Sequence, residues 1–253
     1  MNKGTREGDR AEEDFVIEFN SGAFSAFGDR YFPGVTNLRA VRVTSYQFSS
    51  LSNGHVKPKA DAFLISTDIQ RGRNDSGSGQ LLAEDDLSEF PHRIIANSGI
   101  SIKRPDSKNY QIHKFTRASF LAVFGDPFLG AGALVYTKNE LKIAENREIL
   151  KGWGISVGEF ERELSGRTQT PLHQIANDYK LIQRHCLAEI KRRILSDQTK
   201  LDVVFFGQTT FKSPYFAKYS YIKRVLGIAT ASDFNVTQGS NRLNDPTIVV
   251  KPS

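Results

Sequence analysis

The chain has 253 residues, of which 39% are hydrophobic and 25% charged, and its mean hydropathy is −0.39. These values exclude a wholly disordered or fibrous protein and leave enough chain for a substantial core. No apolar run approaches the roughly 18 residues of a membrane span, and residues 1–14 are too polar for a signal peptide. The single cysteine excludes an internal disulfide and a cysteine-based zinc cluster, so we expect a cytoplasmic protein without a membrane partner.

The first elements follow clear local patterns. Residues 6–19 predict an amphipathic helix, and the valine- and aromatic-rich stretch 38–48 predicts a strand. The Asn53-Gly54 pair is typical of a tight turn, and residues 60–67 predict a short, mostly apolar strand.

Later elements alternate between strands and helices. The alternation of apolar and polar residues over 100–103 predicts a brief strand, and the proline-led stretch 171–195 predicts the longest helix, with Cys186 on its buried stripe. Further predicted elements are helices over 108–124 and 139–150 and strands over 201–206, 226–231 and 247–250. We find no internal repeat and no interdomain linker. The order of elements predicts one mixed α/β (α+β) domain over residues 1–253.

The charge distribution favours a nucleic-acid partner. The formal net charge is +6 and the sequence pI is near 9.3. From residue 198 to the end, basic side chains outnumber acidic ones seven to three and are interleaved with tyrosine and phenylalanine. Such a stretch is typical of nucleic-acid binding, although a solvated basic surface has the same composition.

Several familiar catalytic motifs are absent from the sequence. No lysine follows the glycine-rich stretch 77–79, so there is no P-loop. The histidines show no His-Glu-x-x-His spacing, and there is no Gly-x-Ser-x-Gly elbow. Zinc-protease and serine-hydrolase chemistry are therefore not expected.

Two charged residues flank predicted strands and suggest metal-assisted phosphodiester cleavage. Asp61 begins one short apolar strand and Lys103 ends another, so both side chains reach a common cleft if these strands pair. Carboxylates are ligands that Mg²⁺ prefers, and a lysine beside the metal can orient water and stabilise phosphate charge. Glu12 on the first helix could complete a second metal position.

These segments resemble a known nuclease family. The stretch Pro58-Lys-Ala-Asp61-Ala-Phe-Leu-Ile, followed by Gly99-Ile-Ser101-Ile-Lys103, resembles the PD-(D/E)xK pattern, and among such nucleases the MspI-like type II restriction endonucleases. The resemblance implies a central mixed sheet flanked by helices and one or two Mg²⁺ ions. It implies metal ligation by Asp61, the Ile102 carbonyl and Glu12, and catalysis by Lys103. Ser101, a further candidate catalytic residue, stands where the family has an acid or an amide and could offer only a hydroxyl or act through water.

The resemblance also implies double-stranded DNA as the substrate, cut at a short palindromic site by a monomer or a homodimer. Residues 200–253 would contribute strands and DNA-recognition loops. Arginine pairs well with guanine, and glutamine or asparagine with adenine, whereas lysines suit phosphates. The candidate DNA-binding residues are Lys108, Gln111, Lys114, Lys212, Lys218, Lys223, Gln238, Asn241 and Arg242.

Other interpretations remain open at this point. The same scaffold could serve a repair or mobile-element nuclease, or a noncatalytic DNA-binding protein, which the serine at position 101 favours. Asp61 could be an ion-pair partner of Lys59, and Glu13 could face the site in place of Glu12. An acid from the cluster at 84–86 could also project into the site.

Overall fold

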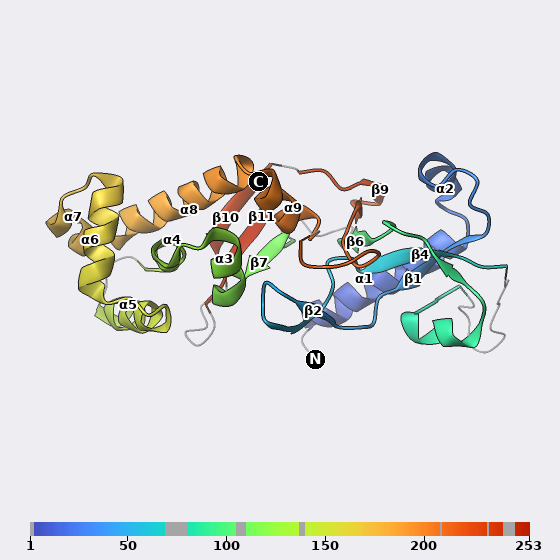
Figure 1. Ribbon diagram of the computed structural model, residues 1–253, viewed down its shortest axis with the longest axis horizontal. Helices are drawn as coiled ribbons and strands as arrows, with labels where there is room; N and C mark the ends of the chain where they lie inside the picture. Colours follow the sequence, from blue (N-terminus) through green and yellow to red (C-terminus); the bar gives the residue numbers. More distant parts are fainter. Residues whose placement is uncertain are drawn as a thin grey trace. The chain divides into compact units, whose positions relative to one another are not determined.

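The computed structural model describes residues 3–68, 80–104, 110–136, 140–207, 209–231, 233–239 and 246–253, without the side chains of 3–6 and 140–144 (Figure 1). Backbone contacts divide the chain into two compact units. Unit 1 comprises Met1–Ser49, Gly54–Tyr110 and Phe205–Ala231, and unit 2 comprises Ser50–Asn53, Gln111–Val204 and Ser232–Ser253. The sequence led us to expect one domain, whereas its basic tail contributes to both units. No helix among the described residues is long and apolar enough to cross a membrane.

Unit 1 is built on a six-stranded mixed sheet with the strand order β1-β4-β6-β8-β9 and with β5 beside β4. The pairing of β6 with β8 is parallel and the other pairings are antiparallel. The strands of this sheet are β1 (Leu38–Arg42), β4 (Ala62–Ser66), β5 (Arg93–Ile94), β6 (Ile100–Ile102), β8 (Tyr219–Ile222) and β9 (Val225–Ile228). The other elements of unit 1 are α1 (Lys3–Asn20), α2 (Ser25–Tyr31), the 3₁₀ helix η1 (Glu84–Glu89) and strands β2 (Gln47–Ser49) and β3 (Gly54–Val56).

Helix α1 covers one face of this sheet (Figure 1). Its Phe15 and Phe19 pack with Ala62 and Leu64 of β4 in one buried cluster. The alternate residues of β4 turn to the other face, where Phe63 joins a second cluster. Because successive strand side chains point to opposite faces, β4 is apolar on both sides. The predictions of a helix over 6–19 and of strands near 60–67 and 100–103 are confirmed.

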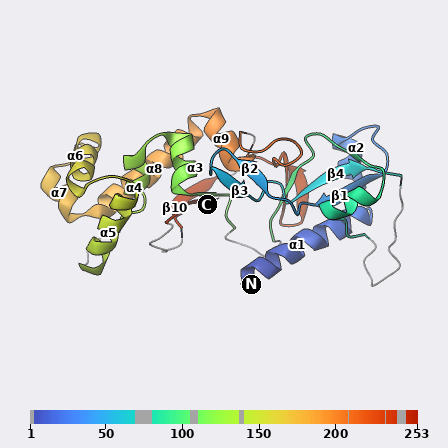
Figure 2. The same ribbon diagram turned by 60° about the horizontal axis from the view of Figure 1, so that its bottom comes forward.

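The predicted strand 38–48 is interrupted in the structure. It forms β1 and β2, and β2 pairs with β3 as a separate hairpin whose turn contains Asn53 at φ 52° (Figure 2). A residue distant in sequence causes the break: Glu84 Oε2 accepts hydrogen bonds from the backbone N–H of Thr44 at 2.7 Å and of Ser45 at 2.8 Å. These N–H groups are therefore not used in a sheet ladder.

Unit 2 combines helices with a three-stranded antiparallel sheet of order β10-β11-β7. Helix α8 packs against α4 and β10. The strands are β7 (His113–Phe115), β10 (Phe234–Gln238) and β11 (Ile248–Pro252). The helices are α3 (Arg117–Phe124), α4 (Pro127–Gly132), α5 (Glu140–Gly152), α6 (Val157–Thr168), α7 (Leu172–Asn177) and α8 (Tyr179–Leu195), and α9 (Gln198–Phe205) links the two units in sequence.

Three sequence-based predictions were wrong in this region. The segment 108–124 is not one helix, because its residues 113–115 pair with β11 before Thr116 caps α3. The predicted strand 201–206 lies in and just beyond α9, whose first amides donate hydrogen bonds to the Asp197 carboxylate that caps it. The predicted helix 171–195 is interrupted at Asp178, which caps α8.

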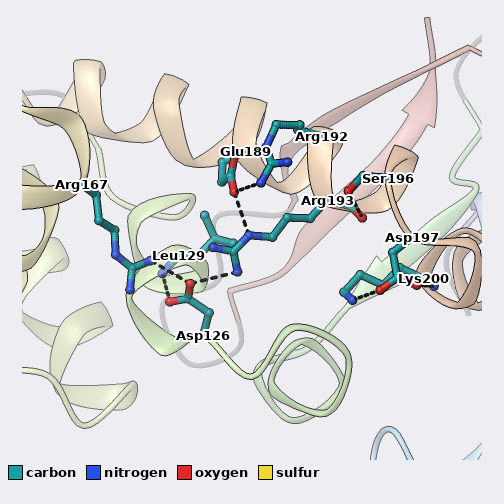
Figure 3. A network of polar contacts seen from close by, with 9 residues as sticks. All are labelled: Asp126, Leu129, Arg167, Glu189, Arg192, Arg193, Ser196, Asp197 and Lys200. Carbon is teal, nitrogen blue, oxygen red and sulfur yellow. Dashed lines mark hydrogen bonds and ion pairs between the residues drawn. The ribbon is translucent and has the colours of Figure 1, made fainter.

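A buried ion-pair network joins three helices of unit 2 (Figure 3). Asp126, whose side chain is 11% exposed, accepts a hydrogen bond from the Leu129 amide and so caps α4. Its Oδ2 lies 2.7 Å from Arg167 of α6 and 3.1 Å from Arg193 of α8. Burial alone would raise the pKa of Asp126, but hydrogen bonds from Arg167 and Leu129 hold it below its ordinary 3.8. The network fastens α4, α6 and α8 together.

Candidate functional site

Asp61 and Lys103 converge at one end of the unit 1 sheet. Strands β4 and β6 pair antiparallel with Ala62 opposite Ile100, and the Asp61 amide donates to the Ile100 carbonyl at 2.8 Å. Lys103 Nζ lies 3.8 Å from Asp61 Oδ2, and each side chain is 23% exposed. The spatial part of the sequence prediction is therefore confirmed, while the chemical roles of the two groups stay a prediction.

Ser101 and Ile102 hold the Asp61 carboxylate in place. Asp61 Oδ2 accepts a hydrogen bond from the Ile102 amide at 2.7 Å and another from Ser101 Oγ at 3.3 Å. The contact from residue 102 is thus through its N–H, whereas the predicted metal ligand was its carbonyl. Among the described residues, both hydrogen bonds and the Lys103 ion pair fall on Asp61 Oδ2.

Glu12 is near the site but is held by another residue. Arg42 of β1 donates from Nε to Glu12 Oε2 at 3.0 Å, and its other nitrogens lie 3.0 Å from Glu13 and Asp9. Burial, followed by the negative charge of Asp61, raises the pKa of Glu12 to about 7 despite Arg42. Glu12 is the more buried member of the Glu12–Glu13 pair, at 16% against 40% exposure. The predicted second carboxylate therefore acts on Asp61 through its charge, and no direct contact joins the two described side chains.

Sequence reasoning missed a second lysine in this site. Continuing the β4–β6 register places Lys59 opposite Lys103. Burial, and then the charge of Lys103, lowers the pKa of Lys59 to about 7, with Asp61 opposing the shift. The backbone of Gly207, at φ 70°, lies so close that an added Cβ would be 2.8 Å from Lys59 Cβ. The spacing of two residues between Lys59 and Asp61 could have indicated that both face the same side.

Gly99 sets the position of the lysine strand. A Cβ at this residue would lie 2.0 Å from the Phe216 carbonyl oxygen and 2.2 Å from that of Pro214. Only a glycine allows this approach, which places β6 in register beside β8. The site thus depends on a backbone contact that the sequence motif does not show.

The carboxylates available for a metal are few. Among the described residues, no group of at least three His, Cys, Asp or Glu side chains is arranged to hold a metal ion. The site offers Asp61, with the nearby charge of Glu12, and two lysines. Mg²⁺ often takes only one or two protein carboxylates and completes its shell with water and phosphate oxygens, so this donor set suits it.

The acids at 84–86 do not enter the site. Glu84 binds the amides of residues 44 and 45 and accepts a hydrogen bond from Tyr215 at 2.7 Å. Asp86 accepts from the Ala83 amide at 2.9 Å and caps η1, and Asp85 contacts Thr44. These carboxylates stabilise loop structure in unit 1.

The candidate DNA-binding residues are divided between the units. Lys212, Lys218 and Lys223 belong to unit 1 and are exposed. Lys223 and Arg224 form the β8–β9 turn, both with positive φ, of 51° and 63°. This is the turn conformation that Asn-Gly usually occupies, so two basic side chains take it against their backbone preference.

The remaining candidates belong to unit 2 or lie outside the described residues. Gln111 and Lys114 are both exposed. Lys114 lies in strand β7 and Gln111 precedes that strand, so the two residues are not on the helix that was predicted over 108–124. The Gln238 amide donates to the Leu134 carbonyl at 3.0 Å and accepts from Gln183 at 3.3 Å, which favours a packing role. Lys108, Asn241 and Arg242 lie outside the described residues.

Comparisons with known proteins neither identify nor exclude a family. No family model, no curated protein and no solved structure matches this chain. The functional interpretation therefore rests on the residues and their geometry.

Proposed function

We propose that this protein is a Mg²⁺-dependent endodeoxyribonuclease of the PD-(D/E)xK type that cuts double-stranded DNA at a short sequence, as type II restriction endonucleases do. The observation that carries the proposal is the 3.8 Å approach of Lys103 Nζ to Asp61 Oδ2 across strands β4 and β6. The two residues are 42 positions apart in sequence, and their positions at the ends of two short predicted strands, together with the motif, led us to expect them together.

The carboxylate is arranged to hold a cation. Hydrogen bonds from Ile102 and Ser101 orient the Asp61 carboxylate through Oδ2, and the side chain keeps 23% of its surface exposed for a ligand. Burial, followed by the negative charge of Asp61, raises the pKa of Glu12, and a divalent cation would offset the repulsion between the two carboxylates. When bound, Mg²⁺ would activate water and neutralise charge on the phosphate.

The lysines supply the complementary part of the chemistry. Lys103 would orient the attacking water and stabilise the negative charge that develops on the phosphate oxygens. Lys59 is opposite Lys103 and would add a second positive charge when it is protonated. Exposed lysines elsewhere in unit 1 would contact phosphates and hold the duplex without reading its sequence.

The direct test is DNA cleavage with single-site variants. Purified protein is incubated with Mg²⁺ and unmethylated long DNA, and the same is done with Asp61→Asn and Lys103→Met. We expect discrete fragments with the wild type and a loss of about 10²-fold or more for each variant, the range typical for removing such groups. The matched controls Asp29→Asn and Lys151→Met, which remove exposed charges of other elements, should cut normally.

Two results would contradict the proposal. Equal cutting by all of these proteins would show that the observed nuclease is a contaminant or uses another site. No cutting by the wild type, with any divalent cation, would exclude the enzyme. A smear in place of discrete fragments would support a nuclease with relaxed sequence preference, as in repair or mobile elements.

One observation favours a noncatalytic alternative. Ser101 replaces the acid or amide of the family pattern, and its hydroxyl is used to hold Asp61. A DNA-binding protein on this scaffold would bind DNA without taking up Mg²⁺. Calorimetry separates the two functions, because the enzyme should show Mg²⁺ binding that Asp61→Asn abolishes.

A further inference from the structure

One face of the β2–β3 hairpin is aromatic and basic and is exposed. In this hairpin Phe48 is opposite His55, and their rings meet edge to face with centroids 6.2 Å apart. Continuing the alternation places Tyr46 and Lys57 on the same side. Tyr46 is 60% and Phe48 64% exposed, and His55 and Lys57 are also exposed. We call these four residues the hairpin face.

The opposite side of the hairpin is less exposed. Gln47 and Val56 are half-buried there and Ser49 is buried, so burial alternates along both strands. The hairpin is therefore a folded element that has one covered side and one uncovered side. Large exposed apolar side chains that gather on one side of an element mark interaction sites.

Hydrogen bonds fasten both ends of the hairpin to unit 1. On the side of β2, Glu84 accepts from the amides of Thr44 and Ser45, and Tyr215 donates to the same carboxylate at 2.7 Å. On the side of β3, the Ala60 amide donates to the Tyr215 carbonyl at 3.0 Å. Tyr215 thus fixes both stems, and the aromatic side chains project from a rigid support.

The hairpin face lies close to the candidate active site. Lys57 is four residues before Asp61, and the Val43 amide, just before the β2 stem, donates to the Asp61 carbonyl at 3.0 Å. The positive charge of Lys57 also acts on Glu12, whose pKa it lowers. A DNA molecule bound with its phosphate at Asp61 would therefore have its neighbouring nucleotides within reach of the hairpin face.

We propose that the hairpin face binds DNA by stacking Tyr46 and Phe48 on bases that have left the helical stack beside the cleaved phosphate, with His55 and Lys57 on the adjacent backbone. This inference rests on the proposed function for the identity of the polymer. The face carries rings, a lysine and no acid, which complements a polyanion whose bases present flat π surfaces. Four side chains are also too few for the roughly 800 Å² per partner of a stable protein interface.

The test measures binding without cleavage. A fluorescein-labelled 24-base-pair duplex is compared with the same duplex carrying a short mismatched bubble that contains 2-aminopurine, both in EDTA. We expect tighter binding of the bubble by wild-type protein, with quenching of 2-aminopurine by the stacked rings. The double variant Tyr46→Ala/Phe48→Ala should bind the bubble at least about tenfold more weakly and lose the quenching.

Matched variants separate stacking from folding and from surface hydrophobicity. Val225→Ala/Ile228→Ala removes two exposed apolar side chains from β9 of the same unit, at 69% and 50% exposure, and should bind as the wild type does. Phe48→Trp keeps a ring and should retain the preference for the bubble.

Four outcomes would overturn the inference, and the first three concern DNA binding and oligomeric state. The first is that Tyr46→Ala/Phe48→Ala binds the bubble as tightly as the wild type does. The second is that the wild type shows no preference for the bubble over the duplex. The third is that the wild type is a dimer, and that the double variant loses the dimer while its DNA binding is unchanged. Binding to anionic vesicles that depends on the two rings, in the absence of ring-dependent DNA binding, would assign the face to a membrane and overturn it as well. Failure of plasmid cleavage with ring-dependent binding intact would reject the nuclease alone.

Discussion

Removing the Arg42 guanidinium tests how the helix beside the site is held. Arg42 of β1 contacts Asp9, Glu12 and Glu13 of α1, each at 3.0 Å. Its side chain is 19% exposed, so the charge is largely withdrawn from water. Substitution with methionine keeps most of the aliphatic stem and removes all three ion pairs together.

The three contacts differ in burial and therefore in strength. Glu12 is 16% exposed, and a hydrogen bond to such a charged group contributes about 1.5–3 kcal/mol to stability. Asp9 and Glu13 are 29% and 40% exposed, and pairs near the surface contribute about 0.2–1 kcal/mol each. Together these values predict that Arg42→Met lowers the free energy of unfolding of unit 1 by about 3 kcal/mol.

The assay must report on unit 1 alone, because the protein need not unfold in one step. Pulse-labelling hydrogen exchange across a urea series, read on peptides from α1 and β1, gives this free energy directly. Arg10→Met is the control, since Arg10 is 83% exposed and its ion pair to Asp14 is 4.0 Å long. We expect it to change the free energy of unfolding by less than about 0.5 kcal/mol.

The reasoning would be refuted if Arg42→Met and Arg10→Met lowered the free energy of unfolding by amounts within about 1 kcal/mol of each other. That result would show that burial does not strengthen the Arg42 contacts. Loss of protection in β1 with α1 unaffected would likewise contradict the assignment of these contacts to the helix–sheet junction.

Three further predictions concern the interior. Asp126→Asn should destabilise unit 2 by about 3 kcal/mol near neutral pH. Because the pKa of the Asp126 carboxyl is lowered in the folded state, the stability of the wild type should fall as the pH drops below 3.8. Urea melts followed by Trp153 emission should show a weaker pH dependence of stability in the variant. Burial raises the pKa of the Cys186 thiol to about 12. The stability that the neutral buried thiol supports is therefore present below the ordinary pKa of 9.0 and is lost as the pH rises towards 12. Alkylation of this thiol by iodoacetamide should require unfolding, and reaction at the rate of a free thiol in native buffer would contradict this. Gly99→Ala should destabilise the β6–β8 pairing by more than about 3 kcal/mol in the same exchange assay, whereas Gly8→Ala in α1, with open space around it, should not be destabilising.

Local patterns predicted much of unit 1 correctly. The amphipathic α1, the apolar β4 and the Asn53 turn depend on periodicity and turn chemistry, which act over a few residues. Where the competing influence came from distant residues, local reasoning failed. Residues 113–115 are a strand because β11 offers them hydrogen bonds, and the stretch 38–48 is divided because Glu84 takes the amides of residues 44 and 45.

The same distinction applies to the candidate site. The residue types at Asp61 and Lys103, and their positions at strand ends, were present in the sequence as a motif. The partner of Glu12 was not, because Arg42 follows it by 30 positions and reaches it only when β1 packs on α1. Lys59 was visible as a residue, but its lowered pKa arises from burial and from Lys103 across the strand pair.

The order of amino acids by itself determined which segments can bury one side, where the chain can turn and which charged groups are available. The folded chain alone decided which of those groups meet, which amides are left for side chains to bind, and which ring-bearing face stays in water. The physical reason is that propensity and periodicity act between neighbours along the backbone. Hydrogen bonding, burial and charge act through space, between residues that only the pairing of strands brings together.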